Sequence, residues 1–164
     1  MMQLRRAVSS DAAAIRRLVY RERLNPLGLD WRRFWLVVDE RNAVIACGQV
    51  KPHRGGGREL ASIVVAPHWR GRGVARALIE HLLAHSPPPL YLTCRAALQP
   101  FYARFGFATL RDPLAMPPYF RRVFRAAAGL KRLFPRWEGL LVMIWSANTR
   151  NFSSPNTTKQ VANC

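Results

Sequence analysis

Arg70, Gly71, Arg72 and Gly73 form the segment of this chain that is best suited to bind an anion. A β-branched run precedes this segment and apolar residues at helical spacing follow it, so we predict a strand, a tight loop and a helix. The amides of a helix's first turn lack intrahelical partners, and the helix dipole places partial positive charge there. Because glycines let a ligand approach the backbone and arginines add charge, we predict a pyrophosphate site.

The same loop also fits two roles that need no pyrophosphate. Arg-Gly-Arg-Gly suits a solvated turn, and it equally suits a piece of an RNA-binding arginine-glycine segment. Two familiar phosphate loops are excluded by their residue requirements. A P-loop needs Gly-Lys-Ser/Thr, and a dinucleotide fingerprint needs a third glycine and a later acidic residue for the ribose.

The elements that position this loop follow from the apolar pattern and the breakers. A helix between the strands Glu59–Ala66 and Leu90–Cys94 implies that these two strands pair in parallel. Strict alternation in the first of them places Leu60, Ser62 and Val64 on the opposite face from Glu59, Ala61, Ile63 and Val65. We expect a final strand at the edge of the sheet. The expected elements are strands Met2–Val8, Phe34–Val38, Ala43–Val50, Glu59–Ala66, Leu90–Cys94, Phe107–Leu110 and Glu138–Ala147, and helices Ala12–Leu24, Arg72–His85, Leu98–Phe105 and Pro117–Phe134.

The expected helix 117–134 is basic and amphipathic. Its apolar residues gather on one side and its arginines on the other. One interpretation is a helix packed on the domain with a solvated basic face. The alternative is peripheral contact with an anionic membrane or an acidic partner.

Length and composition predict one globular domain with a strong positive charge. The chain has 164 residues, 49% of them hydrophobic, and a formal net charge of +17. We expect residues 1–147 to form a single domain and residues 148–164 to be a disordered polar tail. The charge favours anionic partners, among them coenzyme phosphates, acidic proteins, nucleic acid and membranes, without selecting one.

The cysteines point to a reducing compartment. Cys47, Cys94 and Cys164 are few and widely spaced, so neither a disulfide framework nor a zinc site is predicted, and no metal is expected. No apolar run reaches the roughly 20 residues of a membrane span, and the N-terminus lacks the pattern of a signal peptide. A cytoplasmic location is therefore expected.

Two motifs together resemble the GCN5-related N-acetyltransferase (GNAT) superfamily. The first is Arg-x-x-Gly-x-Ala, at Arg70, Gly73 and Ala75. The second is Phe101-Tyr102-x-x-Phe105-Gly106-Phe107, which is similar to the late helix of the family. They occur in the family's order, with one helix and one strand between them. The resemblance covers residues 59–110, and it departs from the family at Arg95, where many members carry an asparagine that contacts the coenzyme.

The resemblance implies an α/β (α+β) fold. Its sheet would be mixed and mostly antiparallel, with about six to seven strands, a central splayed parallel pair and helices on both faces. It also implies acyltransferase activity, in which an amine attacks acetyl-CoA directly within a ternary complex. The alternative is a non-catalytic basic module that keeps the coenzyme fold and binds nucleic acid or an anionic membrane.

The resemblance also assigns site residues. Tyr102 takes the place of the general acid, and Glu59 that of a base acting directly or through water. The acceptor side would include Asn25, Leu27 and Trp31, although Trp31 equally suits a core position. The residues expected to bind acetyl-CoA are Ile63, Val64, Val65, Arg70, Gly71, Arg72, Gly73, Val74 and Ala75.

The charge of the chain favours some acceptors over others. A net positive surface repels polyamines and aminoglycosides, so a protein lysine or an N-terminal amine is the expected acceptor. No specific nucleic acid is expected to bind. Nothing in the sequence chooses between a monomer and a dimer.

Overall fold

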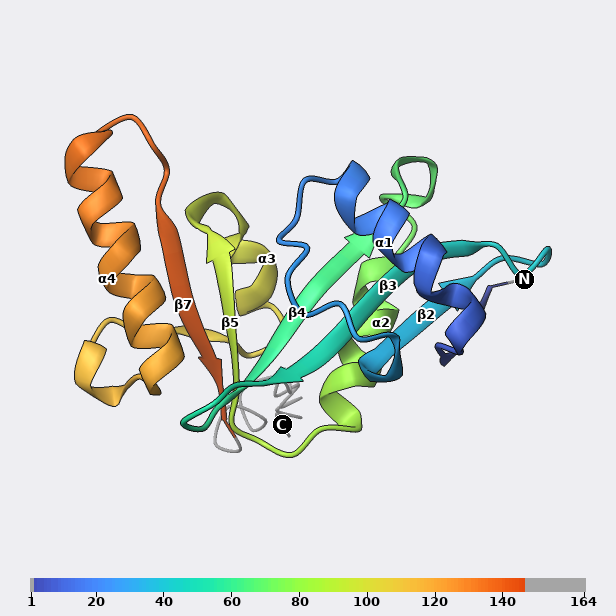
Figure 1. The fold of residues 1–164 in the computed structure, drawn as a ribbon, viewed down its shortest axis with the longest axis horizontal. Helices are drawn as coiled ribbons and strands as arrows, with labels where there is room; N and C mark the ends of the chain where they lie inside the picture. Colours follow the sequence, from blue (N-terminus) through green and yellow to red (C-terminus); the bar gives the residue numbers. More distant parts are fainter. Residues whose placement is uncertain (1, 147–164) are drawn as a thin grey trace, which may run out of the picture.

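The computed structural model describes residues 2–146, and the seven strands of this part form one sheet. The strand order is β1-β2-β3-β4-β5-β7-β6, and all neighbours are antiparallel except β4 and β5 (Figure 1). The predicted fold class is therefore confirmed. The strands are β1 (Gln3–Arg6), β2 (Phe34–Val38), β3 (Val44–Pro52), β4 (Arg58–Val65), β5 (Leu90–Arg95), β6 (Ala108–Thr109) and β7 (Leu140–Trp145), and the helices are α1 (Ala12–Arg21), α2 (Val74–Ala84), α3 (Gln99–Ala103) and α4 (Pro118–Leu133).

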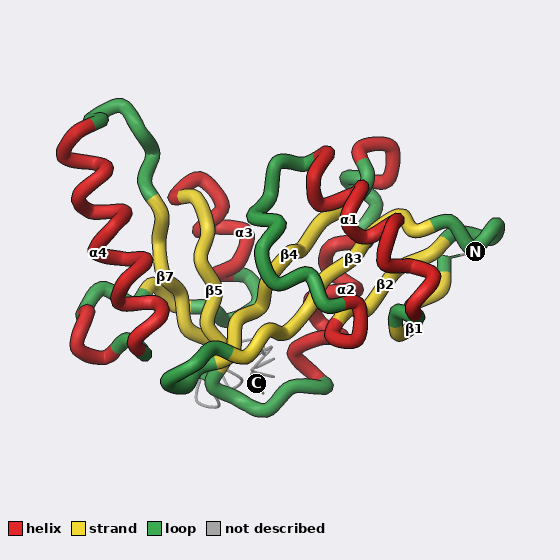
Figure 2. The backbone as a smooth tube through the Cα atoms, viewed as in Figure 1, coloured by secondary structure: helices red, strands yellow, loops and turns green. Residues whose placement is uncertain are grey.

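Helices cover both faces of this sheet. α2 and α3 lie on one face, where Leu78, Ile79 and Leu82 of α2 are buried against the sheet. α1 and α4 lie on the other face, α1 over β2 and β3 and α4 over β5 and β7 (Figures 1 and 2). Each fully buried aliphatic side chain contributes about 1.5–3 kcal/mol. The apolar stripes of the helices thus hold them to the sheet.

The last described strand is not at the edge of the sheet, so that prediction was wrong. β7 pairs with β5 along its whole length, from Leu140 opposite Arg95 to Trp145 opposite Leu90. The two-residue strand β6 lies outside it. The connection through α4 is long enough to bring β7 back beside β5, where both of its edges are paired. Ala147 and the predicted tail 148–164 lie outside the described residues.

A β-bulge in β4 changes the faces that were predicted for its side chains. Ala61 pairs with Gln49 and Val64 with Cys47, so two residues of β4 oppose Gly48 alone. Ser62 absorbs the extra residue with φ 56°. As a result Leu60 faces the same cluster as Ile63 and Val65, whereas Val64 faces α1. The predicted alternation is wrong beyond Ala61, because one inserted residue reverses every later side chain.

Beyond its first residues β4 moves away from β5. Glu59 opposite Tyr91 is the one paired position between these parallel strands in the described chain. The main-chain groups of β4 that face β5 after Glu59 therefore have no ladder partner. Parallel strands that splay in this way open a wedge at their carboxyl ends, which is where ligands bind in α/β sheets.

The first helix ends three residues before the predicted Leu24, whereas the other three helices end within two residues of the prediction. α1 ends at Arg21, and the following loop crosses the face of β3 and β4 (Figure 2). There Lys51 and Gln49 donate hydrogen bonds to the carbonyls of Leu27 and Gly28. α4 packs through Phe120 and Ala127, but every residue from 128 to 136 is exposed. No helix among residues 2–146 is both long and apolar enough to span a bilayer.

Candidate active site

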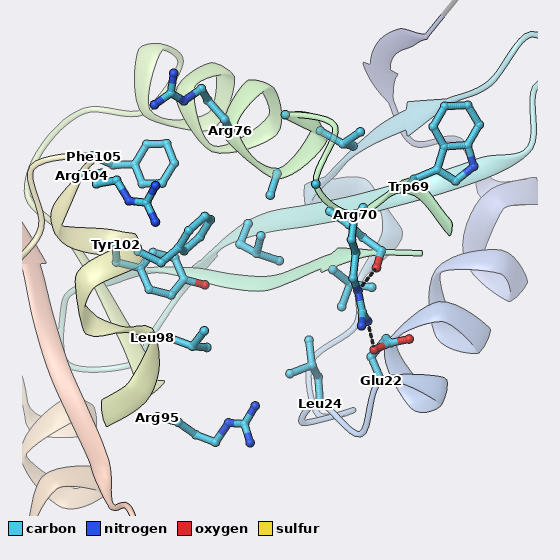
Figure 3. A pocket seen from close by; sticks show the side chains of 18 residues that line it. Glu22, Leu24, Trp69, Arg70, Arg76, Arg95, Leu98, Tyr102, Arg104 and Phe105 are labelled. Carbon is cyan, nitrogen blue, oxygen red and sulfur yellow. Dashed lines mark hydrogen bonds and ion pairs between the residues drawn. The ribbon is translucent and has the colours of Figure 1, made fainter. Parts of the chain in front are cut away.

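A cavity of about 770 Å³ occupies the wedge between β4 and β5. It lies between the N-terminus of α2, the carboxyl end of β4 and helix α3 (Figure 3). Its volume is in the range of small-molecule sites in proteins. The lining residues are Glu22, Leu24, Ile63, Val64, Val65, Trp69, Arg70, Gly71, Gly73, Val74, Ala75, Arg76, Arg95, Leu98, Phe101, Tyr102, Arg104 and Phe105.

The loop before α2 has the backbone of an anion site. Gly71 and Gly73 have φ values of 75° and 76°, which side chains other than glycine rarely adopt. A Cβ at either position would meet nothing within 4 Å, so the space above the loop is open to a ligand. Gly73 caps α2, and no side chain caps the helix. The amides of its first turn are therefore directed at the open space without a partner, as a pyrophosphate site requires.

Arg70 supports the wall of the cavity from the side of α1. Its Nε donates a hydrogen bond to the carbonyl of Val65 at 3.2 Å, and its guanidinium forms an ion pair with Glu22 (Figure 3). This arrangement ties the end of β4 to the residue that follows α1. The single carboxylate in the cavity lining is thereby neutralised.

Tyr102 enters the cavity from the opposite wall. It is on α3, its ring packs edge-on against Phe101, and its hydroxyl points into the cavity (Figure 3). Burial of the side chain raises the pKa of Tyr102 to about 12, with a smaller contribution from Cys94. The phenol therefore stays protonated, and it can act as a donor toward a developing negative charge.

Glu59 lies at the closed end of the wedge and does not line the cavity. It is buried, and its carboxylate contacts His53 Nε2 at 2.7 Å and accepts a hydrogen bond from Thr93 Oγ1 at 3.0 Å. The ring of Tyr119 on α4 stacks on His53 with 3.6 Å between centroids. The histidine thus covers this carboxylate, a pairing that no pattern in the sequence indicates.

The other predicted site residues divide into two groups. All the predicted coenzyme residues line the cavity except Arg72, whose guanidinium lies over the ring of Trp69 at 5.2 Å. Asn25, Leu27 and Trp31 do not line it. Asn25 closes a turn by accepting a hydrogen bond from the amide of Leu27, and Trp31 packs against the α1 core.

Several cavity residues were not predicted to be there. Glu22 precedes the loop expected on the acceptor side, of which Leu24 lines the cavity as expected, and Arg76 and Arg104 extend the basic lining. Arg95 entered the sequence analysis only as a departure from a family motif. Its position at the carboxyl end of a splayed strand is the signal that could have identified it.

Comparisons with known proteins agree with this geometry. Residues 30–109 match the family described as acetyltransferase (GNAT) domain. No curated protein sequence matches the chain.

Three solved structures illustrate the similarity. N-acetylglutamate synthase from Neisseria gonorrhoeae, complexed with coenzyme A and N-acetyl-glutamate, is 18% identical with a TM-score of 0.66 over 89% of this chain and 35% of that chain. Rv2747 from Mycobacterium tuberculosis, in complex with CoA, is 22% identical with a TM-score of 0.66 over 88% and 98%. The NatC complex bound to Gag peptide and CoA contains a chain that is 17% identical with a TM-score of 0.61 over 88% and 98%.

These identities support a shared fold and nothing finer. The chain spans about a third of the Neisseria synthase.

Proposed function

Because the chain belongs to the GCN5-related N-acetyltransferase (GNAT) superfamily, we propose that it transfers an acetyl group from acetyl-CoA to a primary amine. The amine attacks the thioester directly while both substrates are bound. The observation that carries this proposal is the loop of Gly71 and Gly73 at the uncapped end of α2, which opens into the same cavity as Tyr102.

The chain binds the coenzyme mainly through its backbone. The amides of Val74, Ala75 and Arg76 hold the pyrophosphate, and Arg76 adds charge at the rim. The pantetheine arm runs along Ile63, Val64 and Val65, whose main-chain groups facing β5 have no ladder partner. An amide of this segment near Val64 stabilises the oxyanion, a contribution of about 3 kcal/mol for one such donor.

The reaction moves one proton from the amine to the departing sulfur. As the nitrogen forms its bond to the acetyl carbon, the carbon–sulfur bond breaks, and Tyr102 donates a hydrogen bond to the sulfur. A phenol of pKa about 12 is a weaker acid than a thiol of pKa about 8.5, so complete transfer is uphill by roughly 5 kcal/mol. Tyr102 therefore stabilises the thiolate, which finally takes its proton from the attacking nitrogen.

Glu59 acts as a base through water: it accepts the proton that a protonated acceptor must lose before its nitrogen can attack. It is five residues before Val64 on β4, at the closed end of the wedge, so it does not touch the attacking amine. The contact with His53 keeps the carboxylate oriented. This arrangement suits proton removal toward the side of the sheet where α4 lies.

The acceptor is an amine, and a protein lysine or an N-terminal amine is favoured over a polyamine because of the net charge of +17. Two of the structural neighbours support an amine acceptor. The Neisseria protein was solved with N-acetyl-glutamate, and NatC was solved with a peptide.

We further propose that the exposed end of α4 contacts an anionic membrane surface. Leu133 and Phe134 are 75% and 60% exposed there, beside Lys131, Arg132 and Arg136. The sequence from 113 to 137 contains six cationic residues and no acidic one. Apolar side chains among cations complement a lipid surface with anionic headgroups, which needs no shaped groove as a protein partner would.

Titration calorimetry tests the enzyme against the rival, a basic module without catalysis. Acetyl-CoA should bind in the micromolar range, and Gly73→Glu should abolish binding, because it strains a left-handed residue and places a carboxylate where phosphate binds. Gly129→Glu on α4 is the matched control and should bind normally. Steeply salt-dependent RNA binding without affinity for acetyl-CoA would favour the module instead.

A further inference from the structure

The cavity has two chemically different ends. At one end are the loop 70–73 and the first turn of α2, which supply amides for the phosphates. At the other end are Leu24 and Arg95, and the hydroxyl of Tyr102 lies between the two ends (Figure 3). An acceptor that reaches the thioester beside Tyr102 therefore arrives past Arg95.

Arg95 differs from the other arginines that line the cavity, because no group of the described residues pairs with its guanidinium. Arg70 pairs with Glu22, Arg76 faces Glu80 at 3.8 Å, and Arg104 lies over the ring of Phe101 at 5.9 Å. Among residues 2–146 the guanidinium of Arg95 has no hydrogen-bond, ion-pair or ring partner. Its backbone is fixed, because Arg95 pairs with Leu140 as the last residue of β5.

The two carboxylates near the cavity do not pair with Arg95, because each already has other partners. Glu22 is bound by Arg70, and Glu59 is bound by His53 and Thr93. The acceptor end of the cavity thus carries an uncompensated positive charge on a rigid strand end. A planar guanidinium in this position is suited to bind a carboxylate through two parallel hydrogen bonds.

We propose that Arg95 binds a carboxylate of the acceptor, so that the enzyme acetylates amines that carry a carboxylate on the same or the adjacent residue. This inference rests on the proposed function and narrows its substrate class. Free α-amino acids and peptides with an acidic first residue both present this pair of groups. Polyamines and lysines in basic segments lack the carboxylate, and Arg95 repels their additional positive charge.

Steady-state assays of CoA release test the proposal with matched acceptors. Free alanine is compared with alanine amide, an Asp-first peptide with its Asn-first counterpart, and both sets with spermidine. The unmodified enzyme should prefer carboxylate acceptors by about tenfold or more in kcat/KM. The free amino acid and the peptide distinguish the two sources of the carboxylate.

The variant Arg95→Ala should raise the KM for carboxylate acceptors by about tenfold or more while leaving their amides unchanged. Its affinity for acetyl-CoA, measured by calorimetry, should stay within about twofold of the unmodified protein. Arg17→Ala removes the same charge from an exposed position on α1 and is the matched control. It should change none of these values.

Three results would overturn the inference. In the first, Arg95→Ala weakens acetyl-CoA binding and affects all acceptors alike, which would make Arg95 a coenzyme ligand. In the second, the enzyme prefers amides or spermidine. In the third, acetyl-CoA binds but no carboxylate-bearing amine is acetylated. Absence of acetyl-CoA binding would instead overturn the proposed function itself, so the two failures are distinguishable.

Discussion

Tyr102 is the residue whose chemistry depends most on its surroundings. The ring packs against Phe101 and Phe107, and the hydroxyl points into the cavity. Enclosure raises the pKa of the phenol to about 12 because the phenolate would lose its hydration. The side chain is therefore suited to donate a hydrogen bond at pH values well below 12.

Tyr102→Phe removes this donor and little else. We expect kcat to fall by about a hundredfold and the affinity for acetyl-CoA to stay within about twofold, because the hydroxyl acts on the departing sulfur. Tyr20→Phe, at an exposed position on α1, is the matched control and should keep full activity. Stopped assays of acetylated product measure the rate, and calorimetry measures the affinity. An unchanged kcat would remove Tyr102 from the mechanism.

The pH dependence of kcat gives an independent check. A group acting in its protonated form loses activity as the pH rises through its pKa. Since the pKa of Tyr102 is raised to about 12, its loss should begin only above about pH 11. A basic limb near pH 9 that disappears in Tyr102→Phe would contradict this assignment.

Single residues could be predicted from the sequence where the motif also fixes the backbone. Gly71, Gly73 and Tyr102 belong to this class, and the structure places each of them on the cavity. The partners of charged side chains could not be predicted in this way. Arg70 pairs with Glu22 from 48 positions away, and Arg72 lies on Trp69, because long side chains take whichever partner the fold brings near.

At the scale of elements, β4 shows why the sequence was sufficient for topology and insufficient for register. The β-branched run predicted a strand and the crossover helix predicted its parallel pairing with β5, and both are confirmed. The bulge at Ser62 depends on its neighbour strand, where the Cβ of any residue replacing Gly48 would come within 2.6 Å of Ile63. No pattern within β4 itself carries this information.

α4 provides the prediction at this scale. We expect the protein to sediment with vesicles that contain phosphatidylserine and not with vesicles of phosphatidylcholine alone. The double substitution Leu133→Ser with Phe134→Ser should weaken this binding by about tenfold or more, because two exposed apolar side chains lose their insertion into the lipid.

Tyr20→Ser is the control, since it removes an exposed aromatic side chain from α1. It should leave vesicle binding unchanged. Equal binding to both kinds of vesicle, or no effect of the double substitution, would rule out the membrane as the occupant of this surface. Binding to an acidic protein and not to anionic vesicles would show that the exposed end of α4 binds an acidic protein partner instead of a membrane.

At the scale of the whole molecule, we expect the charge of +17 to raise the rate at which acetyl-CoA reaches the proposed site. Acetyl-CoA is a polyanion, and a strongly positive protein raises its local concentration until salt screens the field. We expect kcat/KM for acetyl-CoA to fall by about tenfold or more between low salt and nearly molar salt. An uncharged acetyl thioester that lacks the nucleotide is the control donor, and its rate should not change with salt. Equal salt dependence of the two donors would contradict steering.

The sheet is weakly paired at its centre, between β4 and β5. Glu59 opposite Tyr91 is the single ladder pair between β4 and β5 among the described residues, so four strands on one side and three on the other share one paired position in the sheet. In the proposed complex, the acetyl-CoA in the wedge adds main-chain hydrogen bonds that β4 and β5 do not make with each other and so connects the two parts of the sheet. In the proposed cycle these contacts form when the coenzyme binds and break when it leaves. Binding and release of the coenzyme therefore also change the stiffness of the protein.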